Sequence, residues 1–192
     1  FLKSLKFAAA TEAQATLPVN HPPVGEAAST LPQGHPSIGG TMPAVAAGTD
    51  NLPKPQWEIP KTWTEEAATQ MLLAKFSATD KDARADITVS SFPGDVGGLL
   101  ANVNRWRRQV NLSAISEAQL SSSIKNLKVQ SESGTLVELE NPDGKSSGLI
   151  GVSVPHNGQT WFFKMIGDAK VVAREKDAFI QFVQNVKLPN AL

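Results

Sequence analysis

Beyond residue 55 the apolar and polar positions of the chain follow the period of strands in some segments and of helices in others. Alternating positions on either side of the polar turn TDKDAR predict two strands that pair as a hairpin, at 69–78 and 85–92. The segment 160–166 is apolar on both faces, which predicts a central strand covered on both sides. Other strands are predicted where turn-rich segments separate apolar runs, at 57–60, 128–131, 136–140 and 148–154.

Helical spacing appears in three segments. The apolar positions between Val96 and Val110 recur at three and four residues, and Asp95 is a candidate N-cap. Ser116 and Gln119 have the spacing of a capping box at the start of a shorter helix. A last helix is predicted over 173–186, with one apolar stripe formed by Phe179, Phe182, Val183 and Val186. These elements predict an α+β fold, in which helices flank an antiparallel β-sheet of about six or seven strands.

The composition of the chain changes near residue 55. Nine of the 13 prolines lie in residues 1–60, with only seven of the 36 charged residues, and all four tryptophans lie beyond residue 56. The first part therefore lacks the apolar surface for a core of its own, and its prolines favour an extended backbone. We predict a short amphipathic segment left after processing at 1–15, an extended proline-rich N-terminal arm at 16–55, and a folded domain at 56–192. Contact of residues 1–15 with a membrane surface is an alternative interpretation.

Charge and cysteine content exclude several classes of function. The 18 acidic and 18 basic residues balance, which argues against general binding to nucleic acid. Because the chain has no cysteine, disulfides, thiolate zinc sites, iron–sulfur clusters and covalent c-type haem are excluded. The sequence has no apolar run long enough for a transmembrane segment. We predict no cofactor and no metal site.

The predicted arm contains the motif LPxxHPx[V/I]G twice, fourteen residues apart. One interpretation is a linear docking motif whose two copies add avidity, because stiff proline-flanked peptides lose little entropy on binding. A chance product of a low-complexity linker is another, and histidine ligation of a metal or of a partner's haem is a third. The candidate partner-docking residues are Leu17, Pro18, His21, Pro22 and Val24 in the first copy, and Leu31, Pro32, His35, Pro36 and Ile38 in the second.

Three features of the folded part have both a structural and a functional interpretation. Arg105 and Arg108 share one face of the predicted helix. This face is either simply solvated or forms ion pairs with a partner, and both arginines are included among the candidate docking residues. The two glycines of PGDVGG, 93–98, indicate either a helix N-terminus that binds an anion or close packing on the sheet, and we favour packing. His156, in the turn PHNG, is the one histidine available for hydrolase chemistry, but no GxSxG context supports that activity.

Four stretches of the folded part resemble a family of uncharacterised exported bacterial proteins: WEIPKTW, SSFPGDVGGLLANVNRWRRQVNL, NGQTWFFKMIGD and AFIQFVQNVK. The resemblance covers residues 56–188, and FPGDVGGLLANVNRWRRQ is its most specific block. At the level of fold the family is similar to PsbP-type and Mog-type proteins, which implies an antiparallel sheet sandwiched between helices. The resemblance implies binding rather than catalysis, and a location in the periplasm or another extracytoplasmic site, peripheral to a membrane.

The first hypothesis for function is accordingly a non-catalytic accessory subunit. Its arm would dock on the protein subunits of a larger envelope-associated complex, with a membrane redox or photosynthetic complex as one host. A periplasmic carrier with a ligand pocket beside the Trp161 strand is the second hypothesis, and a hydrolase that uses His156 is the third.

Overall fold

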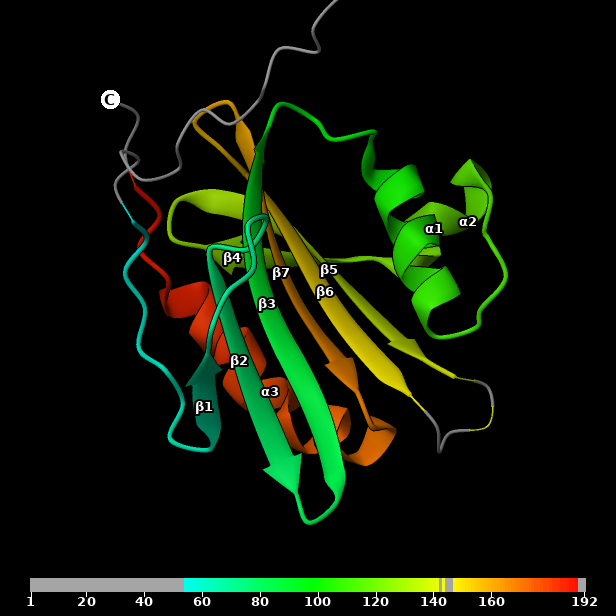
Figure 1. Ribbon diagram of the computed structural model, residues 1–192. Coiled ribbons are helices and arrows are strands. Elements are labelled where there is room, and N and C mark those ends of the chain that lie inside the picture. The colour runs from blue at the N-terminus through cyan, green and yellow to red at the C-terminus, as the bar shows by residue number, and fades with distance from the viewer. Residues whose placement is uncertain (1–53, 142, 144–146, 190–192) are drawn as a thin grey trace, which may run out of the picture. The chain divides into compact units, whose positions relative to one another are not determined.

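The computed structural model describes residues 54–141, 143 and 147–189, all of which belong to the unit Gly48–Leu192. The described residues form one seven-stranded sheet and three helices (Figure 1). The strands are β1 (Trp63–Glu66), β2 (Ala74–Asp80), β3 (Ala83–Pro93), β4 (Lys125–Val129), β5 (Glu132–Glu140), β6 (Gly148–His156) and β7 (Gln159–Gly167). The helices are α1 (Leu99–Gln109), α2 (Glu117–Ser123) and α3 (Ala169–Asn185).

The strand order is β1-β2-β3-β7-β6-β5-β4, and each pair of neighbours is antiparallel. The predicted α+β class, its antiparallel sheet and the central position of the Trp161 strand are confirmed. Strand β3 pairs with β7, which lies much later in the sequence. This pairing joins the hairpin β2–β3 to the second half of the sheet. This pairing decides which side chains meet on the two faces.

One face of the sheet is covered by α3, which lies behind the sheet in the view of Figure 1. The main core lies here, because alternate residues of β3 and β7 point toward α3 and are buried, among them Ile87, Val89 and Phe163. The predicted apolar stripe of the last helix is buried in the same core. The helix begins before the predicted residue 173, since the Asp168 carboxylate accepts from the backbone N–H of Lys170 at 2.9 Å.

Among the described residues, the opposite face is covered only in part, by α1 and α2 (Figure 1). A second, smaller core forms where Val103, Trp106 and Val110 of the α1 region pack against apolar residues of β5 and β6. The predicted capping box of α2 is confirmed, since the side-chain oxygen of Gln119 accepts from the backbone N–H of Ser116 at 3.0 Å. No described helix covers β1, β2 and β3 on this side, and we call the face above these strands and β7 the open face.

The first strand does not lie where the sequence pattern placed it. Residues 57–60 form no strand, and the pairing near them is an isolated bridge between Gln56 and Lys187. The carbonyl of Pro60 instead accepts from the N–H of Trp63 at 2.9 Å, which turns the chain and starts β1 at Trp63. The WEIP prediction was wrong because a short apolar run between prolines does not distinguish a strand from an extended segment.

The start of α1 also differs from the prediction. Asp95 is not the N-cap, because Gly97 and Gly98 have positive φ angles of 79° and 80° and lie outside the helix. A Cβ atom added at either glycine would meet nothing closer than 4.0 Å, so close packing does not explain them. The left-handed backbone conformation explains them, since residues other than glycine rarely adopt it.

Among the described helices, none combines the length and apolar character that a membrane crossing requires.

Candidate functional site

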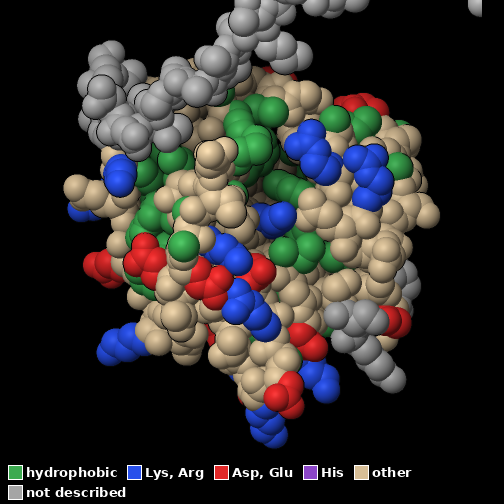
Figure 2. Space-filling view, in the orientation of Figure 1, with side chains coloured by type: hydrophobic (Ala, Val, Ile, Leu, Met, Phe, Trp, Pro, Cys, Tyr) green, Lys and Arg blue, Asp and Glu red, His purple; other side chains and the backbone are tan. Residues whose placement is uncertain are grey.

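A groove of about 170 Å³ lies on the open face, where α1 meets β3 and β7. We call it the Lys164 groove. Its apolar wall consists of Leu72, Phe92, Val96, Trp106 and Phe162, and its polar wall of Thr88, Ser90, Asn102, Arg105, Gln109 and Lys164. Figure 2 shows this face, with apolar side chains beside separate Lys or Arg side chains in its upper part and a mixed acidic and basic cluster below them.

Trp106 forms the helical wall of the groove and is fixed from two sides. Its ring meets Phe162 of β7 edge-on, with ring centroids 6.2 Å apart and an interplanar angle of 84°. Gly151 of β6 lies under the same ring, since a Cβ atom there would lie 2.6 Å from a ring carbon of Trp106. The absence of a side chain at Gly151 therefore sets how closely α1 approaches the sheet.

The loop before α1 is held by Asn102, a residue that is only 4% exposed. Its amide nitrogen donates to the carbonyl of Val96 at 3.0 Å and to that of Gly98 at 2.9 Å. These bonds tie the glycine turn to the first turn of the helix and place Val96 on the groove. Asn102 is thus a positioning residue for the edge of the groove.

Lys164 lies on β7 opposite Thr88 of β3 and points to the open face. Its ammonium donates to the side-chain oxygen of Gln109 at 3.1 Å, and within the described residues it forms no ion pair. Burial lowers the pKa of this amino group, and the attraction of Asp86 offsets only part of that effect. A cation with a neutral partner in a half-buried groove is an electrostatic site for an anion.

Arg105 and Arg108, the predicted docking residues of α1, are both exposed, whereas Trp106 between them is buried. Arg105 lines the Lys164 groove, and Arg108 does not. Neither arginine forms an ion pair or a side-chain hydrogen bond within the described part of the chain, unlike Arg107, which donates to the carbonyl of Ser113 at 2.6 Å. Their role in docking stays a prediction. The ten predicted docking residues of the arm, from Leu17 to Ile38, lie outside the described residues.

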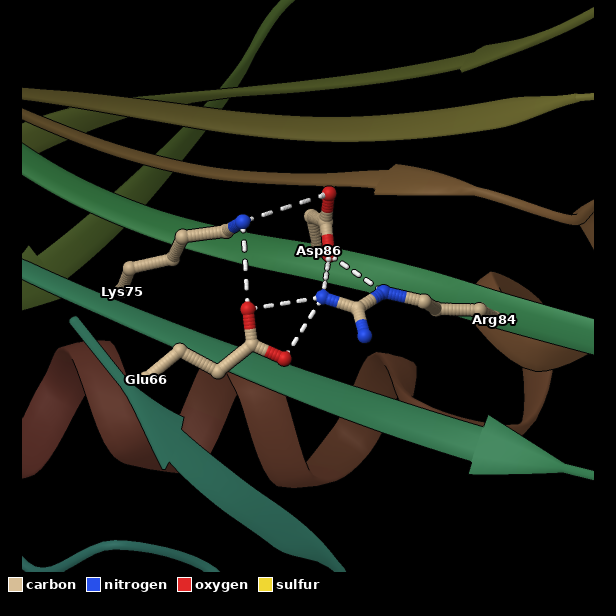
Figure 3. A network of polar contacts seen from close by, with 4 residues as sticks. All are labelled: Glu66, Lys75, Arg84 and Asp86. Carbon is tan, nitrogen blue, oxygen red and sulfur yellow. Dashed lines mark hydrogen bonds and ion pairs between the residues drawn. The ribbon is translucent and has the colours of Figure 1, made fainter. Parts of the chain in front are cut away.

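A network of four charges occupies the open face away from the groove (Figure 3). Arg84 donates to both carboxylate oxygens of Glu66, at 2.6 and 2.8 Å, and to Asp86 at 2.8 Å. The ammonium of Lys75 lies 3.1 Å from Glu66 and 4.0 Å from Asp86. Two cations therefore already meet two carboxylates here. The two cations that line the groove, Lys164 and Arg105, have no carboxylate partner among the described residues.

The same network holds the pKa of Glu66 far below its ordinary value of 4.5, at about 2, through hydrogen bonds from Ser77, Lys75 and Arg84. A lowered carboxylate pKa stabilises the fold above the ordinary value, and that contribution is lost as the pH falls through the folded-state pKa. We expect the difference in unfolding free energy between the wild type and Glu66→Gln to shrink between pH 4.5 and about 2. Urea unfolding at several pH values measures it, with Glu65→Gln as the exposed control. A difference that stays constant over this range would contradict the assignment.

His156 lies in a different environment from the exposed turn that the sequence suggested. Its side chain is only 9% exposed. Nδ1 lies 2.9 Å from a carboxylate oxygen of Glu132, and Nε2 lies 2.9 Å from the carbonyl oxygen of Pro189. A general base for a serine must present one ring nitrogen to the nucleophile. Here both nitrogens contact groups that tie β5, β6 and the segment after α3 together, which is a structural arrangement.

The chemistry that the open face offers is recognition of an anionic group beside apolar surface. The described residues contain no cluster of three or more His, Cys, Asp or Glu side chains arranged to hold a metal ion. Sequence reasoning placed Arg105 in the docking set but missed Lys164, Gln109 and Asn102. One signal was present: Lys164 is the single charged residue within the otherwise apolar stretch WFFKMI, on a strand predicted to be covered on both sides.

No family model matches the chain, and no curated protein shows significant similarity to it. Similar solved structures include LpqN, involved in cell envelope biogenesis of Mycobacterium tuberculosis, which is 13% identical with a TM-score of 0.48 over 74% of this chain and 87% of LpqN. The solution structure of PsbP from Synechocystis sp. PCC 6803 is 12% identical, with a TM-score of 0.44 over 70% of this chain and 86% of that one.

A crystal structure of a protein from Bacteroides thetaiotaomicron is 11% identical, with a TM-score of 0.43 over 71% of this chain. This chain spans only 46% of the length of that protein. The PsbP-like fold expected from the sequence is thus represented among the similar structures. Identities and TM-scores this low carry no argument about ligand, partner or activity, which must come from the site itself.

Proposed function

We propose that the chain is a non-catalytic accessory subunit that docks on a larger protein complex of the bacterial cell envelope. The observation that carries the proposal is the open face, where a groove with apolar rings and two cations without carboxylate partners lies beside α1. Aromatic residues and arginine are the side chains most enriched at the centres of protein interfaces. Met71 adds to this surface, because it is 69% exposed and directly precedes Leu72 of the groove wall.

The N-terminal arm supplies the second attachment in this proposal. Two copies of LPxxHPx[V/I]G on one chain raise the effective concentration of the motif at the partner. The open face then determines the orientation of the folded domain, and the arm adds avidity. The partner in this proposal is a membrane-associated assembly outside the cytoplasm, on the strength of the sequence resemblance to exported bacterial proteins, and a redox or photosynthetic complex is one candidate host.

A periplasmic carrier of a small ligand is a second candidate, because the groove borders β7 as that hypothesis requires. Pockets for small molecules usually have volumes of about 300–1,000 Å³. The Lys164 groove, at about 170 Å³, has room for a group the size of one side chain. This size favours a protein partner that inserts a side chain over a free ligand that is enclosed.

Photo-crosslinking in the source organism tests the accessory function. We expect p-benzoylphenylalanine in place of Met71 to crosslink one partner protein of defined mass, because this position is exposed and directly precedes Leu72 of the groove wall. The matched control places the same amino acid at Lys170, which is exposed in the first turn of α3 on the other side of the sheet. The control should give no such product. Equal products from both positions, or none from Met71, would contradict docking through the open face.

A further inference from the structure

Lys164 is an unusual residue for its position in the fold. It belongs to the central strand β7, and its neighbours Phe163 and Met165 on that strand are fully buried on the α3 side. On its own side the flanking Phe162 and Ile166 pack into the smaller core. Replacement of such a lysine by an apolar residue normally stabilises a protein, because a half-buried ammonium loses hydration. A residue that opposes stability in a packed region suggests a use in binding.

The charges around Lys164 define what it can bind. Asp86 is the carboxylate that acts on Lys164 electrostatically, but Asp86 is held by Arg84 at 2.8 Å. Gln109 satisfies one of the three ammonium donors, at 3.1 Å, and Arg105 contributes a second positive charge to the same groove. The groove lining contains two titratable side chains, Lys164 and Arg105, and both are cations. The missing partner is therefore an anion.

The other wall of the groove determines the shape of the ligand. Phe92 and Phe162 lie 6.2 Å apart between ring centroids, and Phe162 also meets Trp106. An apolar group that enters beside these rings brings a neighbouring acidic group next to Lys164. The space of about 170 Å³ holds one such group at a time.

We propose that the Lys164 groove binds a carboxylate of the partner protein, presented by an aspartate or glutamate that is followed by an aromatic or large apolar residue. Lys164 and Arg105 bind the carboxylate through charge-assisted hydrogen bonds, and the rings of Phe92 and Phe162 contact the apolar neighbour. Asn102 and Gly151 act as positioning residues, since they fix the loop and the helix that form the groove wall. This inference rests on the proposed function and names the chemistry of the contact.

Two capped dipeptides test the charge requirement on the full 192-residue chain. Acetyl-Glu-Phe-amide should shift the NMR signals of the Gln109 side-chain amide and the Trp106 indole N–H, with millimolar affinity, and acetyl-Gln-Phe-amide should bind about tenfold more weakly. Lys164→Met should abolish the preference for the acidic peptide, and Lys164→Arg should retain part of it. Lys170→Met, a change of the same kind on the α3 side, should leave binding unchanged. Equal binding of both dipeptides, or a preference that survives in Lys164→Met, would overturn the inference.

Stability and a free acid provide two further readouts. Lys164→Met should raise the melting temperature by about 2 to 4 °C while it removes binding, whereas a lysine with a purely structural role would lower the melting temperature when replaced. If 3-phenylpropionate binds more than tenfold more tightly than the acidic dipeptide, the groove is a small-ligand site and the partner form of the inference is wrong. The two proposals can fail separately. If the dipeptides bind with charge selectivity but Met71 gives no crosslink, the accessory function is contradicted and the carboxylate site is not. If Met71 gives a crosslink but the dipeptides bind without charge selectivity, the carboxylate site is contradicted and the accessory function is not.

Discussion

Replacement of Gly151 by alanine is expected to lower the free energy of unfolding by about 2 to 3 kcal/mol. The new Cβ atom would lie 2.6 to 2.9 Å from three carbons of the Trp106 ring, which is closer than van der Waals contact allows. The ring cannot move freely, because it is buried against Phe162 and belongs to the smaller core. Helix α1 must therefore shift outward, and urea unfolding of the variant measures the resulting loss of stability.

A double-mutant cycle identifies Trp106 as the cause. In a Trp106→Leu background the space above Gly151 is larger, so we expect Gly151→Ala to reduce stability there by less than about 1 kcal/mol. A loss that is equal in both backgrounds would show that the alanine disturbs the β6 backbone instead. The variant should also widen the Lys164 groove, because Trp106 is its helical wall.

The pattern of apolar residues was sufficient to predict most elements of the fold. Strand β3 and the stripe of α3 follow from apolar positions that repeat every second residue or every third and fourth. Strands β6 and β7 follow from nearly continuous apolar runs bounded by turn-rich segments. The reason is energetic, since burial of Ile87, Phe163 or Phe179 against another element stabilises its segment more than any local interaction does. Boundaries were less accurate, because they depend on turns such as Pro60–Trp63 and on caps such as Asp168.

The site was harder to predict from the sequence than the fold, and the reason is the topology of the sheet. Its residues come from the segment before β2, from β3, from α1 and from β7, and they meet only because β3 pairs with β7. No local period encodes that pairing. In the sequence, Lys164 is one polar residue in an otherwise apolar strand. The pattern indicates that this side chain faces a surface, but it does not show that α1 leaves a groove above that surface.

The glycine turn illustrates a different limit. The two adjacent glycines were visible in the sequence, and both close packing and anion binding were reasonable explanations. The structure shows a third, the positive φ angles of Gly97 and Gly98, which redirect the chain into α1. Backbone dihedral angles of this kind are fixed by the path of the chain between β3 and α1, and composition alone does not reveal it.

Replacement of Glu175 by leucine is expected to reduce the free energy of unfolding by about 3 kcal/mol. Glu175 lies on α3, is 3% exposed, and accepts from the indole N–H of Trp63 at 3.0 Å and from the hydroxyl of Thr62 at 2.8 Å. Arg174 also donates to it, at 2.8 Å. Leucine would leave the buried indole N–H of Trp63 without an acceptor, and the edge strand β1 would lose its polar link to α3.

Two comparisons separate the hydrogen bonds from the loss of charge. Glu175→Gln keeps one acceptor oxygen and should reduce stability by only about 1 to 2 kcal/mol, while Asp177→Leu, the same kind of change at an exposed position of α3, should alter it by less than about 0.5 kcal/mol. Burial acts to raise the pKa of Glu175, but the hydrogen bonds from Thr62, Arg174 and Trp63 outweigh it and lower the pKa. The stabilisation by Glu175 should therefore be present above pH 4.5 and decline as the pH falls below it. If the leucine variant unfolds with the wild-type midpoint at neutral pH, Glu175 does not anchor β1, and this edge of the sheet is held without it by the pairing with β2, the Glu66 network and the apolar contacts of Trp63.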